Sequence, residues 1–114
     1  MSPLDGLEYV AFAVEASPAW QHLVHQPRHR RFGPGDATEH VMVGSGAGAV
    51  VGTAQLVAEQ GDTLTILVSE GEAPMTLVIT VLSPTVAEIS ATSGDNWIRG
   101  VASLLALPPD AHGH

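Results

Sequence analysis

The second half of the chain consists of short strand-forming segments separated by turn-forming residues, and this limits the folds it can adopt. From Thr38 onward five such segments follow one another: TEHVMVG, GAVVGTAQLVAE, TLTILVSE, PMTLVITVLS and TVAEISATS. The separators GSGAG, QGD, GEA and SP supply the Gly, Asp and Pro residues that tight turns need. Connections this short join neighbouring strands in antiparallel order. The pattern therefore predicts an antiparallel β-meander.

Two of these segments alternate regularly enough to show which side chains share a face. Side chains two positions apart on a strand point the same way. In both segments every second residue is apolar, with Thr or Ser at most positions between. Leu67 and Val78 make the opposite face partly apolar, which suggests a dimer surface. The residues expected to face the core are Leu64, Ile66, Val68, Leu77, Ile79 and Val81.

The start of the chain predicts a strand followed by a short helix. The segment LEYVAFAVEA, residues 7–16, favours a strand because its Val and Phe residues alternate, although its apolar residues also fit a helical period. In SPAWQHLVHQ, residues 17–26, Ser17 can cap a helix whose first turn contains Pro18. Pro27 disfavours helical geometry in the residue before it, so the helix is expected to end there.

The last apolar segment predicts an amphipathic helix. The segment DNWIRGVASLLALPP, residues 95–109, can start at a cap formed by Asp95 or Asn96 and must end before its two prolines. On a helix its large apolar residues gather on one side: Trp97, Ile98, Val101, Leu104 and Leu105. The expected fold is thus α+β, with an antiparallel β-meander of five to six strands curved around the C-terminal amphipathic helix, and a short helix after the first strand. A single domain is expected over residues 1–107, with a disordered tail over residues 108–114.

The charge and composition exclude several classes of function. Four arginines, no lysine and twelve carboxylates give a net charge of −8, which disfavours binding to nucleic acids and to anionic membranes. The absence of cysteine excludes disulfides, thiolate metal sites and thiol catalysis. No apolar run reaches the length of a membrane helix, and the first residues lack the pattern of a signal peptide. A cytoplasmic location is therefore expected.

The segment SPAWQHLVHQPRHRRFGPGD, residues 17–36, gathers cationic and histidine side chains. Its arginines could hold a carboxylate or phosphate group through their guanidinium forks, or could form the solubilising exit of a helix, and the second interpretation is favoured. Its histidines have spacings that could hold a metal ion, but a helical wheel directs two of them away from the apolar side, so no metal site is predicted. The residues concerned are Arg28, Arg30, Arg31, His22, His25 and His29.

The segment VEASPAWQHLVHQPRHRRFGPG, residues 14–35, resembles the first-helix pattern of the START-like helix-grip superfamily, which includes polyketide cyclases. The shared features are a Ser-Pro pair, a Trp, a Leu and a later aromatic residue. The resemblance implies an apolar cavity between the curved sheet and the closing helix, holding a small hydrophobic molecule and in some members carrying cyclase or dehydratase chemistry. The superfamily has no shared catalytic motif, so the resemblance implies no catalytic residue.

Two functions are expected from these observations. The first is the binding of a small hydrophobic ligand, or a polyketide cyclase-like reaction on it, with His40 as the candidate for proton transfer because imidazole exchanges protons near neutral pH. The alternative is a non-catalytic dimeric interaction module, such as an acidic chaperone or assembly factor. Neither function is expected to need a cofactor. The residues expected to line the ligand cavity are Leu64, Ile66, Leu77, Ile79, Trp97, Val101 and Leu104.

Overall fold

The computed structural model describes residues 6–34, 40–43, 50–70 and 74–106, and this part of the chain is almost entirely β-sheet. Its strands are β1 (Glu8–Ala16), β2 (Pro27–Pro34), β3 (His40–Val43), β4 (Val50–Gln60), β5 (Thr63–Glu70), β6 (Pro74–Ser83), β7 (Val86–Ser93) and β8 (Asn96–Ala106). Within the described residues, helical structure is limited to the six-residue 3-10 segment η1 (Pro18–Leu23) between β1 and β2. None of the described helical structure is long and apolar enough to cross a membrane.

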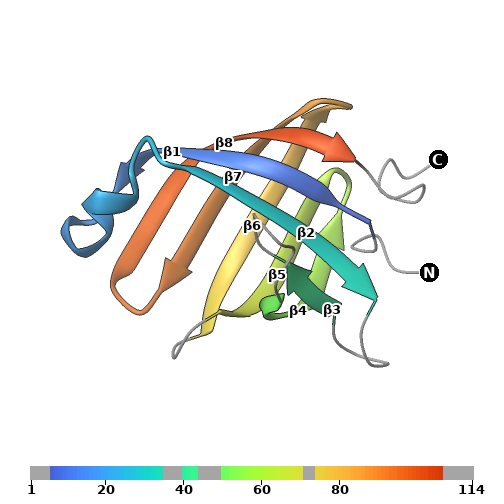
Figure 1. Cartoon of the computed structure of the whole chain (residues 1–114), viewed down its shortest axis with the longest axis horizontal. Coiled ribbons are helices and arrows are strands. Elements are labelled where there is room, and N and C mark those ends of the chain that lie inside the picture. Colours follow the sequence, from blue (N-terminus) through green and yellow to red (C-terminus); the bar gives the residue numbers. More distant parts are fainter. Residues whose placement is uncertain (1–5, 35–39, 44–49, 71–73, 107–114) are drawn as a thin grey trace.

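The strands form a closed antiparallel barrel in which each strand pairs with its neighbours in sequence (Figure 1). The ring closes where β1 pairs with β8, with Glu8 opposite Ala106 at one end. At the other end of this pair Ala16 lies opposite Ile98. The short strand β3 pairs with β4 on one side and, on the other, reaches only the last residues of β2, from Arg31 onward. The first half of β2 therefore pairs with β1 alone.

Strands β3 to β7 confirm the five strand segments predicted from the turn pattern. The strand predicted over residues 7–16 is also confirmed, as β1. The predicted alternation holds as well, because all six residues expected to face the core on β5 and β6 are buried. The tail over residues 108–114 lies outside the described residues.

The predicted α+β fold is wrong, because strand β8, over Asn96–Ala106, lies where a C-terminal helix was expected over residues 95–107. Its start was misinterpreted: Gly94 and Asp95 form a tight turn between β7 and β8, with Gly94 at a φ of 59°. The same dipeptide, Gly61 and Asp62, joins β4 to β5 with a φ of 60° at the glycine. Two-residue hairpin turns require a positive φ, which glycine adopts without strain. The helix-grip arrangement expected from the resemblance is therefore absent from the described part of the chain.

The helix predicted over residues 17–26 is reduced to η1. Ser17 occupies the cap position, but its hydroxyl group does not cap the helix. Its Oγ atom instead accepts a hydrogen bond from the backbone amide of Trp97 at 3.0 Å. After η1, His25 adopts a φ of 68°, in the left-handed region, and the chain turns directly into β2. The three arginines of this segment thus lie on a strand and not at a helix exit.

The hydrophobic core fills the barrel end where β1 begins and β8 ends. Leu7, Phe32, Ile66 and Ile79 are completely buried in it. The ring of Tyr9 lies next to that of Phe32, with their centroids 6.1 Å apart. Aliphatic and aromatic side chains from most of the strands form one core cluster, which is the main source of hydrophobic stabilisation in the described barrel and extends to the cavity residues Tyr9, Val68 and Leu77. The end where β1 ends and β8 begins contains a cavity.

Candidate ligand-binding site

A cavity of about 310 Å³ occupies the barrel end where β1 ends and β8 begins. Several of its wall positions carry small residues, namely Ala11, Ala13 and Ala91. The interior of an eight-stranded barrel is just wide enough to be filled by side chains or to hold one small ligand, so small residues at these positions leave space. The larger apolar and aromatic side chains in the wall are Tyr9, Trp20, Leu23, Val68, Met75, Leu77, Ile89 and Ile98.

Strand alternation turns two arginines of β2 into the cavity. Arg28 and Arg30 line it, and they are in phase with the buried Phe32 further along the same strand. The residues between them face the other way: Arg31 is exposed, and the His29 Nε2 atom lies 2.6 Å from the carboxylate of Glu8 on the neighbouring strand. The Arg30 guanidinium is oriented by a hydrogen bond of 2.7 Å from its Nη1 atom to the carbonyl oxygen of His29.

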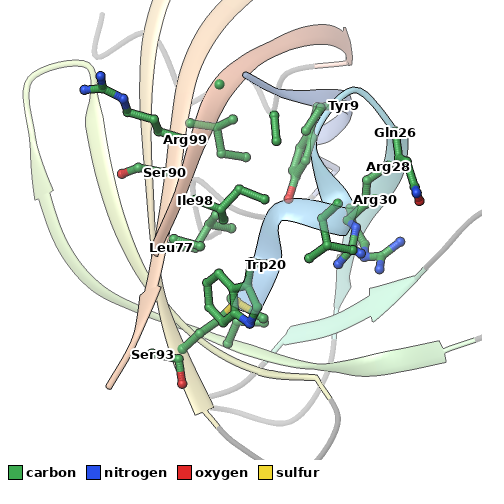
Figure 2. A pocket seen from close by; sticks show the side chains of 18 residues that line it. Tyr9, Trp20, Gln26, Arg28, Arg30, Leu77, Ser90, Ser93, Ile98 and Arg99 are labelled. Atoms are coloured by element: carbon green, nitrogen blue, oxygen red, sulfur yellow. The ribbon is translucent and has the colours of Figure 1, made fainter. Parts of the chain in front are cut away.

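The segment η1 lies at the mouth of this cavity and contributes Trp20 and Leu23 to its lining. Figure 2 shows Arg28 and Arg30 on one side of the view and Leu77 on the other, with Trp20 and Tyr9 between them. A potential ligand in this space would therefore meet cationic groups on one side, an apolar wall on the other and aromatic rings between the two.

Arg99 lies at the edge of the cavity and has a different role. Its Nη2 atom donates a hydrogen bond of 2.8 Å to the carboxylate of Glu15 on the adjacent strand β1. This hydrogen bond, together with the attraction between the opposite charges, raises the pKa of Arg99 above its ordinary value. In Figure 2 the guanidinium points away from Tyr9 and Trp20, so Arg99 faces outward and not into the cavity.

The residues predicted to line a ligand cavity are divided among three places. Leu77 lines the cavity observed here. Trp97 and Val101 are 39% and 47% exposed on the outer side of the barrel, because the helix that was expected to turn them inward is a strand. The remaining four residues belong to the packed core: Leu64, Ile66, Ile79 and Leu104.

The histidines do not form a recognisable catalytic or metal centre within the described residues. His40 is the first residue of β3, opposite Pro34 and Ala54, and its role in proton transfer stays a prediction. His22 and His25 are exposed, whereas His29 contacts Glu8. Over residues 6–34, 40–43, 50–70 and 74–106, no group of three or more His, Asp or Glu side chains could hold a metal ion.

Sequence reasoning missed four residues that define this cavity. Arg28 and Arg30 were interpreted as a helix exit, and Tyr9 and Trp20 were not included in the predicted site. The spacing of two between Arg28, Arg30 and Phe32 was a usable signal, because it places all three on one face of a strand.

Comparisons of the chain with protein-family models, with curated proteins and with solved structures give no match.

Proposed function

We propose that the chain binds one small hydrophobic molecule inside the barrel. The observation that carries this proposal is the cavity of about 310 Å³ with a mostly apolar lining. Ligand-binding pockets in proteins start at about this volume and combine apolar walls with a few polar groups. A packed interior would be more stable than a hollow one, because each missing contact in a core forfeits dispersion energy. The hollow end is thus best explained by an occupant.

Filling the cavity with a side chain tests this proposal. In Ala91→Phe, a large ring replaces a small residue of the cavity wall, so the variant is expected to lose ligand binding. The matched control is Ala58→Phe on the exposed side of β4, which should bind as the wild type does. Native mass spectrometry of protein purified from its own host supplies the readout, since a bound molecule adds mass that is lost on denaturation. Wild-type protein that carries no such mass and binds no hydrophobic probe in titrations would refute the proposal.

A chemical reaction in the cavity is a further part of this proposal. The cyclase or dehydratase chemistry implied by the resemblance stays a prediction. The use of His40 as its proton-transfer group also stays a prediction, and the register places His40 opposite Pro34, at the end of β2 away from Arg28 and Arg30. Catalysis by His40 would be supported if the wild-type protein consumes the bound ligand and the variant His40→Gln leaves it intact. A cytoplasmic location likewise stays a prediction.

A second candidate, a dimeric interaction module, is favoured by the apolar side chains on the outer face of the barrel. Leu67 on β5 is 40% exposed. Phe12 on β1 and Val101 on β8 are cross-strand partners, and they are 39% and 47% exposed. Exposed apolar groups in neighbouring positions are typical of association surfaces. Analytical ultracentrifugation tests this candidate: a homodimer that Phe12→Ser converts to monomer supports it, and a monomer at all concentrations excludes it.

A further inference from the structure

The cavity concentrates positive charge in a protein that is otherwise acidic. The chain has a net charge of −8 and only four Arg or Lys residues. Two of the four, Arg28 and Arg30, face the cavity, whereas Arg99 at its edge points outward and is paired with Glu15. No Asp or Glu is among the described residues that line the cavity. The described lining of this end therefore places the positive charges of Arg28 and Arg30 beside a mostly apolar wall, where a low local dielectric strengthens their attraction for an anion.

Within the described residues, no hydrogen-bond or ion-pair partner balances the charge of Arg28. Its side chain is half-buried. A charged group beside apolar walls is stabilised when an opposite charge accompanies it. Arg30 is already oriented by its bond to the His29 carbonyl oxygen. A partner that would balance the charge of Arg28 is thus an anion that enters the cavity.

The geometry of the two arginines suits a single anionic group. They are two residues apart on one strand face, so their Cα atoms are separated by about 7 Å, and long side chains can converge over this distance. A guanidinium fork binds a carboxylate through paired hydrogen bonds. Beyond the arginines the cavity is bounded by Leu77, Ile98 and Trp20, which match an apolar body and not a second charge.

Building on the proposed binding function, we infer that the ligand is an amphiphilic organic carboxylate. Its carboxylate is held by Arg28 and Arg30, and its apolar body extends past Trp20 toward Leu77. Arg28 and Arg30 are then the residues that determine specificity for an anionic ligand over a neutral one.

A matched pair of probes separates the charge of a ligand from its apolar body. Octanoate and 1-octanol share the same carbon chain and differ in charge at one end. Binding is followed by fluorescence in the variant Trp97→Phe, where the cavity residue Trp20 is the remaining tryptophan. Octanoate is expected to bind about tenfold or more tightly than 1-octanol, the effect of one charge-assisted hydrogen bond. Sodium chloride should weaken the binding of octanoate and not that of 1-octanol.

Variants of β2 assign this preference to residues. Arg28→Gln and Arg30→Gln should each reduce the preference for octanoate, and the double variant should abolish it while 1-octanol still binds. The control Arg31→Gln, on the exposed face of the same strand, should keep the preference. Thermal melting establishes whether each variant folds. If the double variant does not fold, the two single variants still test the inference.

Each of the remaining outcomes contradicts a defined part of the argument. Equal binding of octanoate and 1-octanol to the wild type would overturn the inference and leave the proposed binding function standing. A preference that survives in Arg28→Gln and Arg30→Gln would also overturn it, because the arginines would then only cover the wall with their aliphatic stems. Binding of neither probe would refute the proposed function together with the inference.

Discussion

At the scale of single residues, Ser17 connects two distant parts of the barrel through one hydroxyl group. Its side chain is almost completely buried, at 4% exposure. The Oγ atom accepts a hydrogen bond from the Trp97 amide at 3.0 Å and lies 3.2 Å from Oδ1 of Asn96. The backbone amide of Ser17 also donates to the Trp97 carbonyl oxygen at 2.9 Å. These bonds fasten the start of η1, and with it the mouth of the cavity, to the start of β8.

The variant Ser17→Ala should test this connection. It leaves the Trp97 amide without its side-chain partner, and an unsatisfied buried group typically costs about 1–3 kcal/mol of unfolding free energy. Urea denaturation followed by circular dichroism measures the loss. Ser103→Ala, at an exposed position of β8, should change stability by no more than about 0.5 kcal/mol. A similar midpoint for Ser17→Ala and the wild type would contradict this role.

Gly100 is required by the close approach of β8 to β1. A Cβ atom at this position would lie 2.0 Å from the carbonyl oxygen of Phe12 and 2.7 Å from the Cα atom of Ala13. Both are backbone atoms, which cannot move without disturbing the strand pair that closes the barrel. Gly100→Ala is therefore expected to destabilise the protein by about 1–3 kcal/mol or more.

Gly33→Ala is the matched control for this variant. Gly33 also lies on a strand and is buried, but a methyl group added there would have no atom of a described residue within 4 Å beyond those of its chain neighbours. Thermal unfolding of both variants gives the comparison. Equal melting temperatures for Gly100→Ala and Gly33→Ala would show that the close approach of β8 to β1 does not require a glycine at position 100.

At the scale of elements, η1 covers the cavity without being part of the core. None of its residues is buried, although Trp20 and Leu23 line the cavity. Trp20→Ala should therefore change stability little and instead weaken the binding of octanoate and 1-octanol by a similar factor, because both lose the same aromatic contact. Isothermal titration calorimetry measures the two affinities. A loss confined to octanoate would instead assign Trp20 to the binding of the anionic group.

Two elements show how far the sequence predicts this fold. Strands β4 to β7 could be predicted because their alternation and their turns agree. Strand β8 was taken for a helix because Ile98, Val101 and Leu104 fit a helical period, whereas a strand places only Ile98 and Leu104 on one face. Two signals favoured the strand: Gly100, which would weaken a helix, and the Gly94 turn. Similarly, polar residues on both faces of the first half of β2 hid its alternation, and with it the cavity arginines.

At the scale of the whole molecule, the barrel has a packed end and a hollow end. Leu7 and Phe32 are completely buried at the packed end, whereas the first half of β2 pairs on one side only. Local stability follows the density of buried contacts and of protected hydrogen bonds. Hydrogen exchange measured by mass spectrometry should thus be slow in β6 and β7, which pair with a strand on both sides, and fast in η1 and residues 27–30. Saturation with octanoate should slow the exchange of residues 27–30, and uniform exchange over all the strands would contradict this division.

The closure of the ring by β1 and β8 means that the order of the strands along the chain is not what defines this architecture. Each strand pairs with the strands before and after it, and Glu8 of the first lies opposite Ala106 of the last. A linker that joins these neighbouring ends and a cut at the Gly61–Asp62 turn would preserve every strand pair. A circularly permuted gene that begins at β5 therefore encodes the same barrel, and new termini at this turn give sites for fusion away from the mouth of the cavity.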